Sequence, residues 1–305
     1  MVMSFKKVAI ILLLLALFAL LPYFGTPYMV VLFSNIFMYV VLTLSWVMFS
    51  GPTGYISLAS AAFFGAGIYT AAVLSFKLPV IMIVLMGATV GFLLALLIGV
   101  ITLRLKGIYF AMFTFGFVEL LLYFVLWYET NIKGTTGRIV FTLENVTVYY
   151  IMYILSIILL LVMYILNKSK YGMALKSIGD NEIASEHSGV NVTRIKILVY
   201  ALSAAFVGAC GSIMATRLTY IDPKIAFNPL YSFIPIFMAI FGGMREIYGP
   251  IIGAFIFSYL QEVLTTKIPY YYMLLFGLLM IFIIAYMPEG LIGLLRINLI
   301  KRNRS

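Results

Sequence analysis

The sequence predicts an all-α polytopic membrane protein with about ten transmembrane helices. Hydrophobic residues make up 64% of the 305 positions and charged residues 10%, whereas soluble domains have about half and about a quarter. The apolar residues are gathered in runs of about 20, the length that a helix needs to cross a hydrocarbon layer about 30 Å thick. We therefore expect one transmembrane domain over residues 1–305, interrupted in its second half by one long polar loop at 167–196.

The first apolar run, Val8 to Leu21, follows Lys6 and Lys7. No small-residue cleavage site follows it before Pro22, so we expect a retained helix rather than a cleaved signal peptide. The other nine runs cover approximately residues 28–49, 56–76, 79–103, 108–128, 146–166, 195–217, 227–241, 248–264 and 270–287. Only the run at 227–241 is too short to cross the bilayer, unless it begins earlier or lies inside the bundle.

The net charge of +10 bears on orientation rather than on nucleic-acid binding, because membrane proteins keep Lys and Arg on the cytoplasmic side. Ten spans place both termini on one side. With both termini in the cytoplasm, six of the 20 Lys and Arg residues lie outside and the other fourteen inside. The six outside are Lys77, Lys133, Arg138, Arg217, Lys224 and Lys267. The polar loop is then cytoplasmic. The four spans between residues 28 and 128 begin outside, whereas the four spans after the loop begin inside. The two groups therefore have opposite orientation, as in an inverted repeat.

Small residues recur every four positions in three of the predicted spans, which lets neighbouring backbones approach closely. The stripes are Ser57, Ala61 and Gly65; Gly87, Gly91, Ala95 and Gly99; and Ala204, Gly208 and Ser212. We expect these stripes to pack helices against each other rather than to bind a ligand.

Two segments should break the helical pattern. Gly51-Pro52-Thr53-Gly54 interrupts an apolar stretch near membrane level; it is either a surface turn or irregular backbone whose polar groups face protein or a water-filled cavity. Gly242-Gly243 and Gly249-Pro250 end one helix and start the next, which predicts a tight cytoplasmic turn.

The polar loop contains start and stop signals for short helices, which a flexible linker would lack. Asp180 or Asn181 can cap a helix N-terminus, Glu182 lies in its first turn, and Gly189 follows as a stop. Seven or eight helical residues form a rod of roughly 12 Å, too short to cross a bilayer. We expect the rod to lie against the membrane surface or to dock into a partner.

The loop residues Tyr171-Gly172-Met173-Ala174-Leu175, Ser177 to Ala184 and Gly189-Val190-Asn191 resemble the cytoplasmic coupling loop of the permeases of branched-chain amino-acid importers driven by ATP. The sequence departs from that pattern at Gly179, where an arginine is usual, and at Ser185, His187 and Ser188. The resemblance implies a loop that fits a groove on the ATPase subunit. The implied coupling residues are Gly172, Ala174, Asp180, Asn181, Glu182, Ala184 and Gly189.

Three further segments are similar to motifs of the same family, in the family's order: residues 54–72, 104–119 and 242–254. The second of them resembles the M-type subunit more than its H-type paralogue. Glu119 is the only formal charge between Ile108 and Trp127, so it should face the bundle interior, be partnered or be protonated. It either lines the translocation path or is a buried structural carboxyl. The residues that we place on the path are Gly54, Ser57, Phe64, Tyr69, Tyr109, Thr114 and Glu119.

The resemblance implies one multi-pass permease domain in the cell membrane, surrounded by lipid, with no cofactor. The implied partners are two ATPase subunits, a paralogous H-type permease forming a heterodimer and an extracytoplasmic substrate-binding protein. The sequence has no phosphate-binding Gly-x-x-x-x-Gly-Lys-Ser/Thr motif, so ATP hydrolysis must come from separate subunits. The implied substrates are leucine, isoleucine and valine, with urea, short amides or nucleosides as alternatives.

Two other classes of function fit the sequence less well. A carrier driven by an ion gradient usually has several partnered ionisable groups inside the membrane, and only Glu119 is clearly placed at mid-span. A membrane enzyme needs a catalytic constellation, and none is visible. The single Cys210 and the single His187 exclude an internal disulfide and a histidine-cluster metal site.

Overall fold

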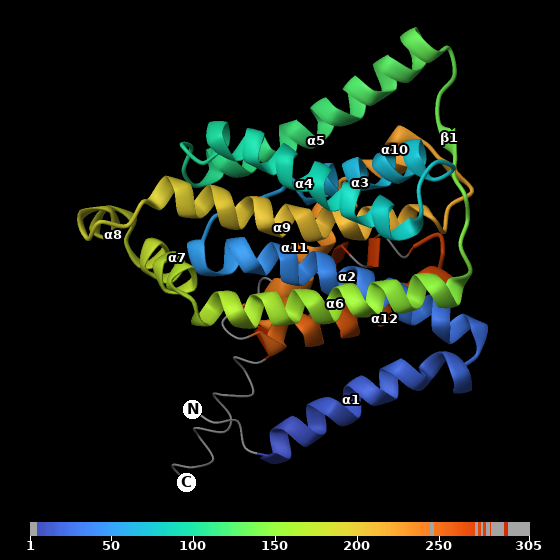
Figure 1. Ribbon diagram of the computed structural model, residues 1–305, viewed down its shortest axis with the longest axis horizontal. Coiled ribbons are helices and arrows are strands. Elements are labelled where there is room, and N and C mark those ends of the chain that lie inside the picture. Colours follow the sequence, from blue (N-terminus) through green and yellow to red (C-terminus); the bar gives the residue numbers. More distant parts are fainter. Residues whose placement is uncertain are drawn as a thin grey trace.

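The computed structural model describes residues 5–244, 247–271, 274–275, 277–278, 281 and 290–291, with side chains from residue 13 onward. The regular elements of the described chain are helices, apart from one pair of two-residue strands. Its long helices lie along one common direction, with α7 and α8 at one end of the molecule and β1 at the other (Figure 1). We call these the α8 end and the β1 end.

The helices are α1 (Phe5–Phe24), α2 (Pro27–Thr53), α3 (Ser60–Leu74), α4 (Val80–Thr102), α5 (Ile108–Tyr128), the π-helical turn η1 (Glu129–Lys133), α6 (Asn145–Lys168), α7 (Lys170–Asp180), α8 (Glu182–His187), α9 (Val192–Ala215), α10 (Pro223–Ala226), α11 (Leu230–Gly242) and α12 (Tyr248–Lys267). The strands are β1 (Arg138–Ile139) and β2 (Tyr220–Ile221).

The prediction of an all-α membrane protein is confirmed, but fewer spans meet the length and hydropathy requirements than the ten expected. Among the described residues, six helices are long and apolar enough: Pro27–Thr53, Val80–Thr102, Ile108–Lys133, Asn145–Lys168, Val192–Ala215 and Pro223–Gly242. The short run predicted at 227–241 gains length because α10 precedes α11. The last predicted run, 270–287, lies mostly outside the described residues, as do Arg245 and Glu246.

The run predicted at 56–76 forms a helix of only 15 residues, α3. Residues 54–59 are not helical because neighbouring side chains satisfy their backbone groups. The Thr114 hydroxyl accepts from Leu58 N at 3.0 Å, and the Ser232 hydroxyl donates to Leu58 O at 2.7 Å. The break also begins later than predicted: α2 continues through Pro52 to Thr53 and is capped by Gly54, whose φ of 71° is left-handed.

Helix α2 is the centre of the bundle, where it contacts α6, α9, α11 and α12 (Figure 1). Every side chain from Ile36 to Ser50 is buried. Helices α4 and α9 pack through two of the predicted small-residue stripes. A Cβ on Gly91 would lie 2.5 Å from Ala204 O, and one on Gly208 would lie 2.4 Å from Gly87 O. The stripes thus hold two backbones in direct contact, as the sequence predicts.

The β1 end contains a feature that the sequence did not predict. Strands β1 and β2 pair antiparallel, with Arg138 opposite Ile221. Beside them the fully buried Glu129 carboxylate accepts from Arg138 Nε at 3.0 Å, Gly137 N at 2.8 Å and the Tyr69 hydroxyl at 3.2 Å. These contacts join the end of α5 to α3 and to the β1 segment.

Candidate functional site

The polar loop folds into two short helices whose ends are capped by its own side chains. Ser169 Oγ accepts from Gly172 N at 3.3 Å at the start of α7, and Asn181 Oδ1 accepts from Ala184 N at 3.0 Å at the start of α8. Gly189 follows α8 with a left-handed φ of 85°. The predicted cap and stop of the rod are confirmed, although α8 has six residues rather than seven or eight and α7 precedes it as a separate helix.

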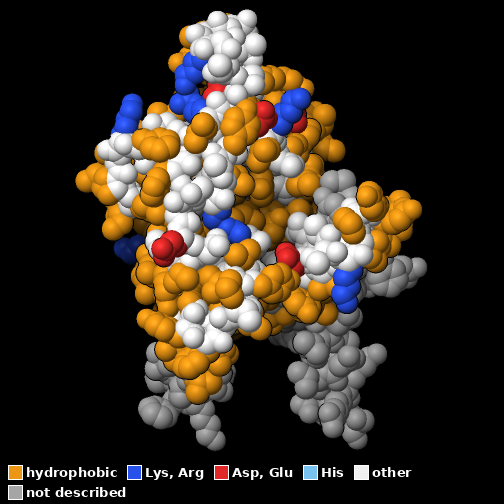
Figure 2. Space-filling view, turned by 90° about the vertical axis from the view of Figure 1, so that its right-hand side faces the viewer, with side chains coloured by type: hydrophobic (Ala, Val, Ile, Leu, Met, Phe, Trp, Pro, Cys, Tyr) orange, Lys and Arg blue, Asp and Glu red, His pale blue; other side chains and the backbone are white. Residues whose placement is uncertain are grey.

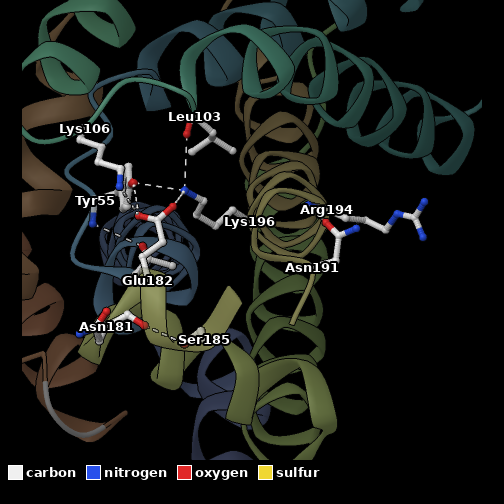
Figure 3. A network of polar contacts seen from close by, with 10 residues as sticks. Tyr55, Leu103, Lys106, Asn181, Glu182, Ser185, Asn191, Arg194 and Lys196 are labelled. Carbon is white, nitrogen blue, oxygen red and sulfur yellow. Dashed lines mark hydrogen bonds and ion pairs between the residues drawn. The ribbon is translucent and has the colours of Figure 1, made fainter. Parts of the chain in front are cut away.

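Glu182, the first residue of α8, connects the loop to the bundle (Figure 3). Its carboxylate lies 2.6 Å from Lys196 Nζ on α9 and accepts from the Tyr55 hydroxyl at 3.0 Å. Lys106, in the α4–α5 connection, lies 3.5 Å away and is largely exposed. Lys196 is buried, and its Nζ also donates to the Tyr55 hydroxyl at 3.1 Å and to Leu103 O at 3.4 Å. We call Tyr55, Lys106, Glu182 and Lys196 the Glu182 cluster.

The cluster keeps Glu182 charged and Tyr55 neutral. Burial by itself raises the pKa of the Glu182 carboxyl. Hydrogen bonds from Lys196 and Tyr55 and the charges of Lys196 and Lys106 lower it more, so the net pKa falls below its ordinary value of 4.5. Burial, the hydrogen bond to Glu182 and the charge of Glu182 together raise the pKa of Tyr55 to about 12. At neutral pH, Tyr55 is therefore a hydrogen-bond donor to an ionised carboxylate.

Close backbone contacts seat α7 against α2 and α6. A Cβ on Gly179 would lie 1.9 Å from Pro52 O, and one on Gly172 would lie 2.1 Å from Leu166 O. The Ser177 and Ser185 hydroxyls, 2.7 Å apart, join α7 to α8. Glycine at 179 thus allows α7 to touch the end of α2 directly.

The loop presents apolar side chains away from the bundle. Ile183 is 63% exposed, Met173 61% and Tyr171 54%. Of the coupling residues implied by the resemblance, Asp180, Asn181, Ala184 and Gly189 are exposed and Ala174 is half-buried, whereas Gly172 is buried. Glu182 points inward to its cluster rather than outward (Figure 3).

A cavity of about 360 Å³ lies beside the loop at the α8 end. It is lined by residues of α2, α6 and α7, among them Pro52, Asn167, Lys176 and Asp180. Within the part of the chain that the structure describes, no three His, Cys, Asp or Glu residues are grouped to hold a metal ion.

The residues that the sequence places on the translocation path are not brought together in one site. Ser57 Oγ lies 3.1 Å from the Tyr200 hydroxyl, and Thr114 bonds the nearby Leu58 backbone. Tyr69 bonds Glu129 at the β1 end. The remaining positions also differ: Phe64 is buried against Tyr231, Gly54 is exposed at the α8 end of α2, and Tyr109 is exposed on α5.

Two of the three arrangements expected for Glu119, a position facing the bundle interior and a contact with a partner, are not found in the described part of the chain. Its side chain is half-exposed on α5 and makes no hydrogen bond or ion pair with the described residues. It lies among exposed apolar residues of the same helix, including Met112, Leu120 and Tyr123.

Sequence reasoning did not find Tyr55, Lys106 and Lys196 as partners of Glu182. One signal was present in the sequence: Lys196 is a charge at the start of an otherwise apolar run, where an unpaired cation would be costly. Nothing in the sequence indicates that its partner lies 14 residues earlier on another helix.

Comparison with known proteins places these features among transport permeases. A family described as "Branched-chain amino acid transport system / permease component" matches residues 28–284. The high-affinity branched-chain amino acid transport system permease protein LivM of Escherichia coli is 28% identical over 87% of this chain and 70% of its own length. The ribose import permease protein RbsC of Haemophilus influenzae is 26% identical over 74% of each chain. No solved structure matches the chain.

Proposed function

This chain belongs to the branched-chain amino acid permease family of ATP-binding-cassette importers, a family of transporters and not of enzymes, and we propose that it carries leucine, isoleucine and valine across the cell membrane. The similarity to LivM supports this substrate class because it extends over 87% of the chain, against 74% for the ribose permease. The substrate class can be tested by loading the partner binding protein with one solute at a time and measuring ATP hydrolysis by the complex. We expect leucine, isoleucine and valine to stimulate it.

The observation that supports the coupling mechanism best is the arrangement of α8. The rod exposes Ile183 on one side, and on the other its Glu182 contacts Tyr55 and Lys196. Two ATPase subunits, one under each permease, would grip the exposed side. Movement of α8 would then pull Tyr55, which lies within the non-helical segment 54–59, and Lys196 near the start of α9. Glu182 is therefore a residue that transmits movement to the bundle rather than one that docks the ATPase.

A second, H-type permease is the proposed partner along α5. A half-exposed carboxylate at mid-helix costs about 2.5–3.5 kcal/mol on insertion scales if it faces lipid. Glu119 would avoid that cost where a paralogous chain covers α5 and supplies a polar partner or a shared aqueous path. The path residues of the sequence prediction would then act in the heterodimer and not within one chain. Their test is transport by Glu119→Gln and Glu119→Leu complexes.

We propose one permease domain over residues 1–305 with ten spans, inverted repeats and cytoplasmic termini. The α8 end would be cytoplasmic, in accord with the distribution of Lys and Arg and with α1 beginning toward that end (Figure 1). The apolar α1 and α3, α12 and the run at 270–287 would complete the count. The opposite face, where basic and acidic side chains are scattered among hydrophobic ones (Figure 2), would receive the binding protein.

Substitution of two isoleucines with similar exposure, one at each end of the molecule, tests whether the ATPase subunits bind at the α8 end. Ile183 is 63% exposed at the α8 end, and Ile139 is 68% exposed at the β1 end. Ile183→Glu should abolish co-purification of the ATPase subunits, because a charge replaces the apolar residue that enters their groove. Ile139→Glu should leave that association intact.

Scrambling 181–189 extends the experiment to the whole rod and should also release the ATPases. Retained association in both the scrambled and the Ile183→Glu complexes would refute coupling through α8. Loss of association in Ile139→Glu as well would indicate a general folding defect.

A further inference from the structure

The cavity of about 360 Å³ at the α8 end is a half-open cleft with an apolar floor, and we call it the loop cleft. Helix α7 closes it against the ends of α2 and α6 (Figure 1). Its floor is formed by Val47 and Met48 of α2 and Met163 of α6, all of which are buried. Its volume lies within the range of about 300–1,000 Å³ that is usual for small-molecule sites.

Two opposite charges lie on the rim of the loop cleft. Lys176 and Asp180 are exposed and four residues apart on α7, so they share one helix face, with Cβ atoms about 5–6 Å apart. Neither forms an ion pair with any residue that the structure describes. A lysine four residues before an acidic residue is also the less favourable order for a pair along a helix. An ammonium and a carboxylate are therefore both available to a ligand.

The two charges select the class of ligand. A simple anion would be attracted by Lys176 but repelled by Asp180, and a simple cation the reverse. A zwitterion satisfies both, provided that its own charges are close together. An α-amino acid has its ammonium and carboxylate on one carbon, and the amide of Asn167, on the same rim, can donate to the one and accept from the other.

The floor selects the side chain of the ligand. Its buried valine and methionines favour an aliphatic group that leaves water on binding. A phospholipid headgroup can carry the same two charges, but the floor belongs to the central helix α2 and not to a lipid-facing surface, so acyl chains have no way to follow. We propose that the loop cleft binds one free α-amino acid with an aliphatic side chain.

The site would regulate transport, a step that depends on the proposed function. If the α8 end is cytoplasmic, the loop cleft is open to the compartment into which leucine, isoleucine and valine are released. A bound amino acid would connect α7, through its charges, to α2 and α6, through its side chain. It would resist movement of α7 and α8 against the bundle, so ATP hydrolysis would fall as the imported amino acid accumulates.

Ligand analogues test the recognition of each group. The purified complex of permeases and ATPases, without its binding protein, would be titrated with radiolabelled leucine. We expect weak competition from leucine methyl ester, which lacks the negative charge, and from 4-methylpentanoate, which lacks the positive one. Alanine should bind roughly tenfold more weakly than leucine, because it leaves the apolar floor unfilled.

Substitutions assign each preference to one side chain. Lys176→Gln should weaken leucine binding about fivefold, near the upper limit for an exposed ion pair, and should abolish the preference for leucine over its methyl ester. Asp180→Asn should abolish the preference over 4-methylpentanoate. Lys170→Gln is the matched control: it neutralises another exposed lysine of α7, outside the lining of the loop cleft, and should change neither affinity nor preference.

ATP hydrolysis by the complex in nanodiscs tests the regulation. The binding protein would be in excess and already saturated with leucine, so that further leucine acts at another site. Added leucine should lower hydrolysis, measured relative to the rate of the same complex without added leucine. Lys176→Gln should shift this inhibition to about fivefold higher leucine concentrations, whereas Lys170→Gln should not.

Two results would overturn the proposal. The first is leucine binding by Lys176→Gln that keeps its preference over the methyl ester. The second is a wild-type complex that binds no leucine but co-purifies with phosphatidylethanolamine, in an amount that Lys176→Gln reduces, because a lipid headgroup would then occupy the loop cleft. Failure of the leucine-loaded binding protein to stimulate hydrolysis would instead contradict the proposed substrate class, and the binding titrations would still decide the site.

Discussion

Replacing Glu182 by glutamine is the most informative single perturbation of the Glu182 cluster. The change keeps the shape of the side chain but removes the charge that faces Lys196 Nζ at 2.6 Å. Lys196 is 2% exposed, so its ammonium cannot turn to water when the partner is lost. Removing one member of a buried ion pair costs about 3–5 kcal/mol.

The lower end of that range applies here, for two reasons. The Glu182 side chain is 23% exposed, and glutamine still offers one oxygen to Lys196. We therefore expect Glu182→Gln to lower the free energy of unfolding by about 3 kcal/mol, roughly a hundredfold in the unfolding equilibrium. Lys106→Met is the matched control: it removes the other, 65% exposed lysine at 3.5 Å and should cost less than about 1 kcal/mol.

Equilibrium unfolding of the purified chain in mixed micelles measures both changes. The double variant Glu182→Gln, Lys196→Met should recover most of the loss, because the uncompensated buried ammonium is then gone. The reasoning is refuted if Glu182→Gln costs no more than Lys106→Met, or if the double variant is less stable than Glu182→Gln alone.

Three further predictions concern the same chain. Because the pKa of Glu182 lies below 4.5 in the folded chain, its stabilisation is complete above pH 4.5 and is lost as the pH falls through the lowered value, so unfolding measured from pH 7 downward should show a decline that Glu182→Gln lacks. Gly208→Ala, whose Cβ would lie 2.4 Å from Gly87 O, should destabilise the chain by about 1–3 kcal/mol in the same unfolding assay, whereas Gly116→Ala, with nothing within 4 Å, should not. Gly179→Ala should push α7 off a backbone oxygen at the end of α2 and reduce substrate-stimulated ATP hydrolysis; unchanged stimulation would contradict the seating of α7.

Local features of the sequence predicted local structure well. The cap at Asn181, the stop at Gly189 and the paired stripes around Gly91 and Gly208 depend on residues within one or two helical turns, and all occur as expected. The position of the α2–α3 break was predicted less well. Its limits are set by Thr114, 56 residues away from the backbone group that it bonds.

The partners in the Glu182 cluster could not be predicted, for a related reason. Tyr55 and Glu182 are 127 residues apart in the sequence, and their contact exists only once α2, α8 and α9 have packed. Strands of two residues, such as β1 and β2, carry too short a pattern to be recognised. Only tertiary packing identifies such contacts.

The most direct test of the account is the side of the membrane on which α8 lies and what covers it there. Ile183→Cys and Ile139→Cys, each in a Cys210→Ala chain, would be treated with a membrane-impermeant maleimide in intact cells and in inside-out vesicles. We predict that Ile183→Cys reacts only in inside-out vesicles and is protected when the ATPase subunits are bound, while Ile139→Cys reacts in intact cells. Reaction of Ile183→Cys in intact cells, or in vesicles without protection by the ATPases, would contradict the central claim.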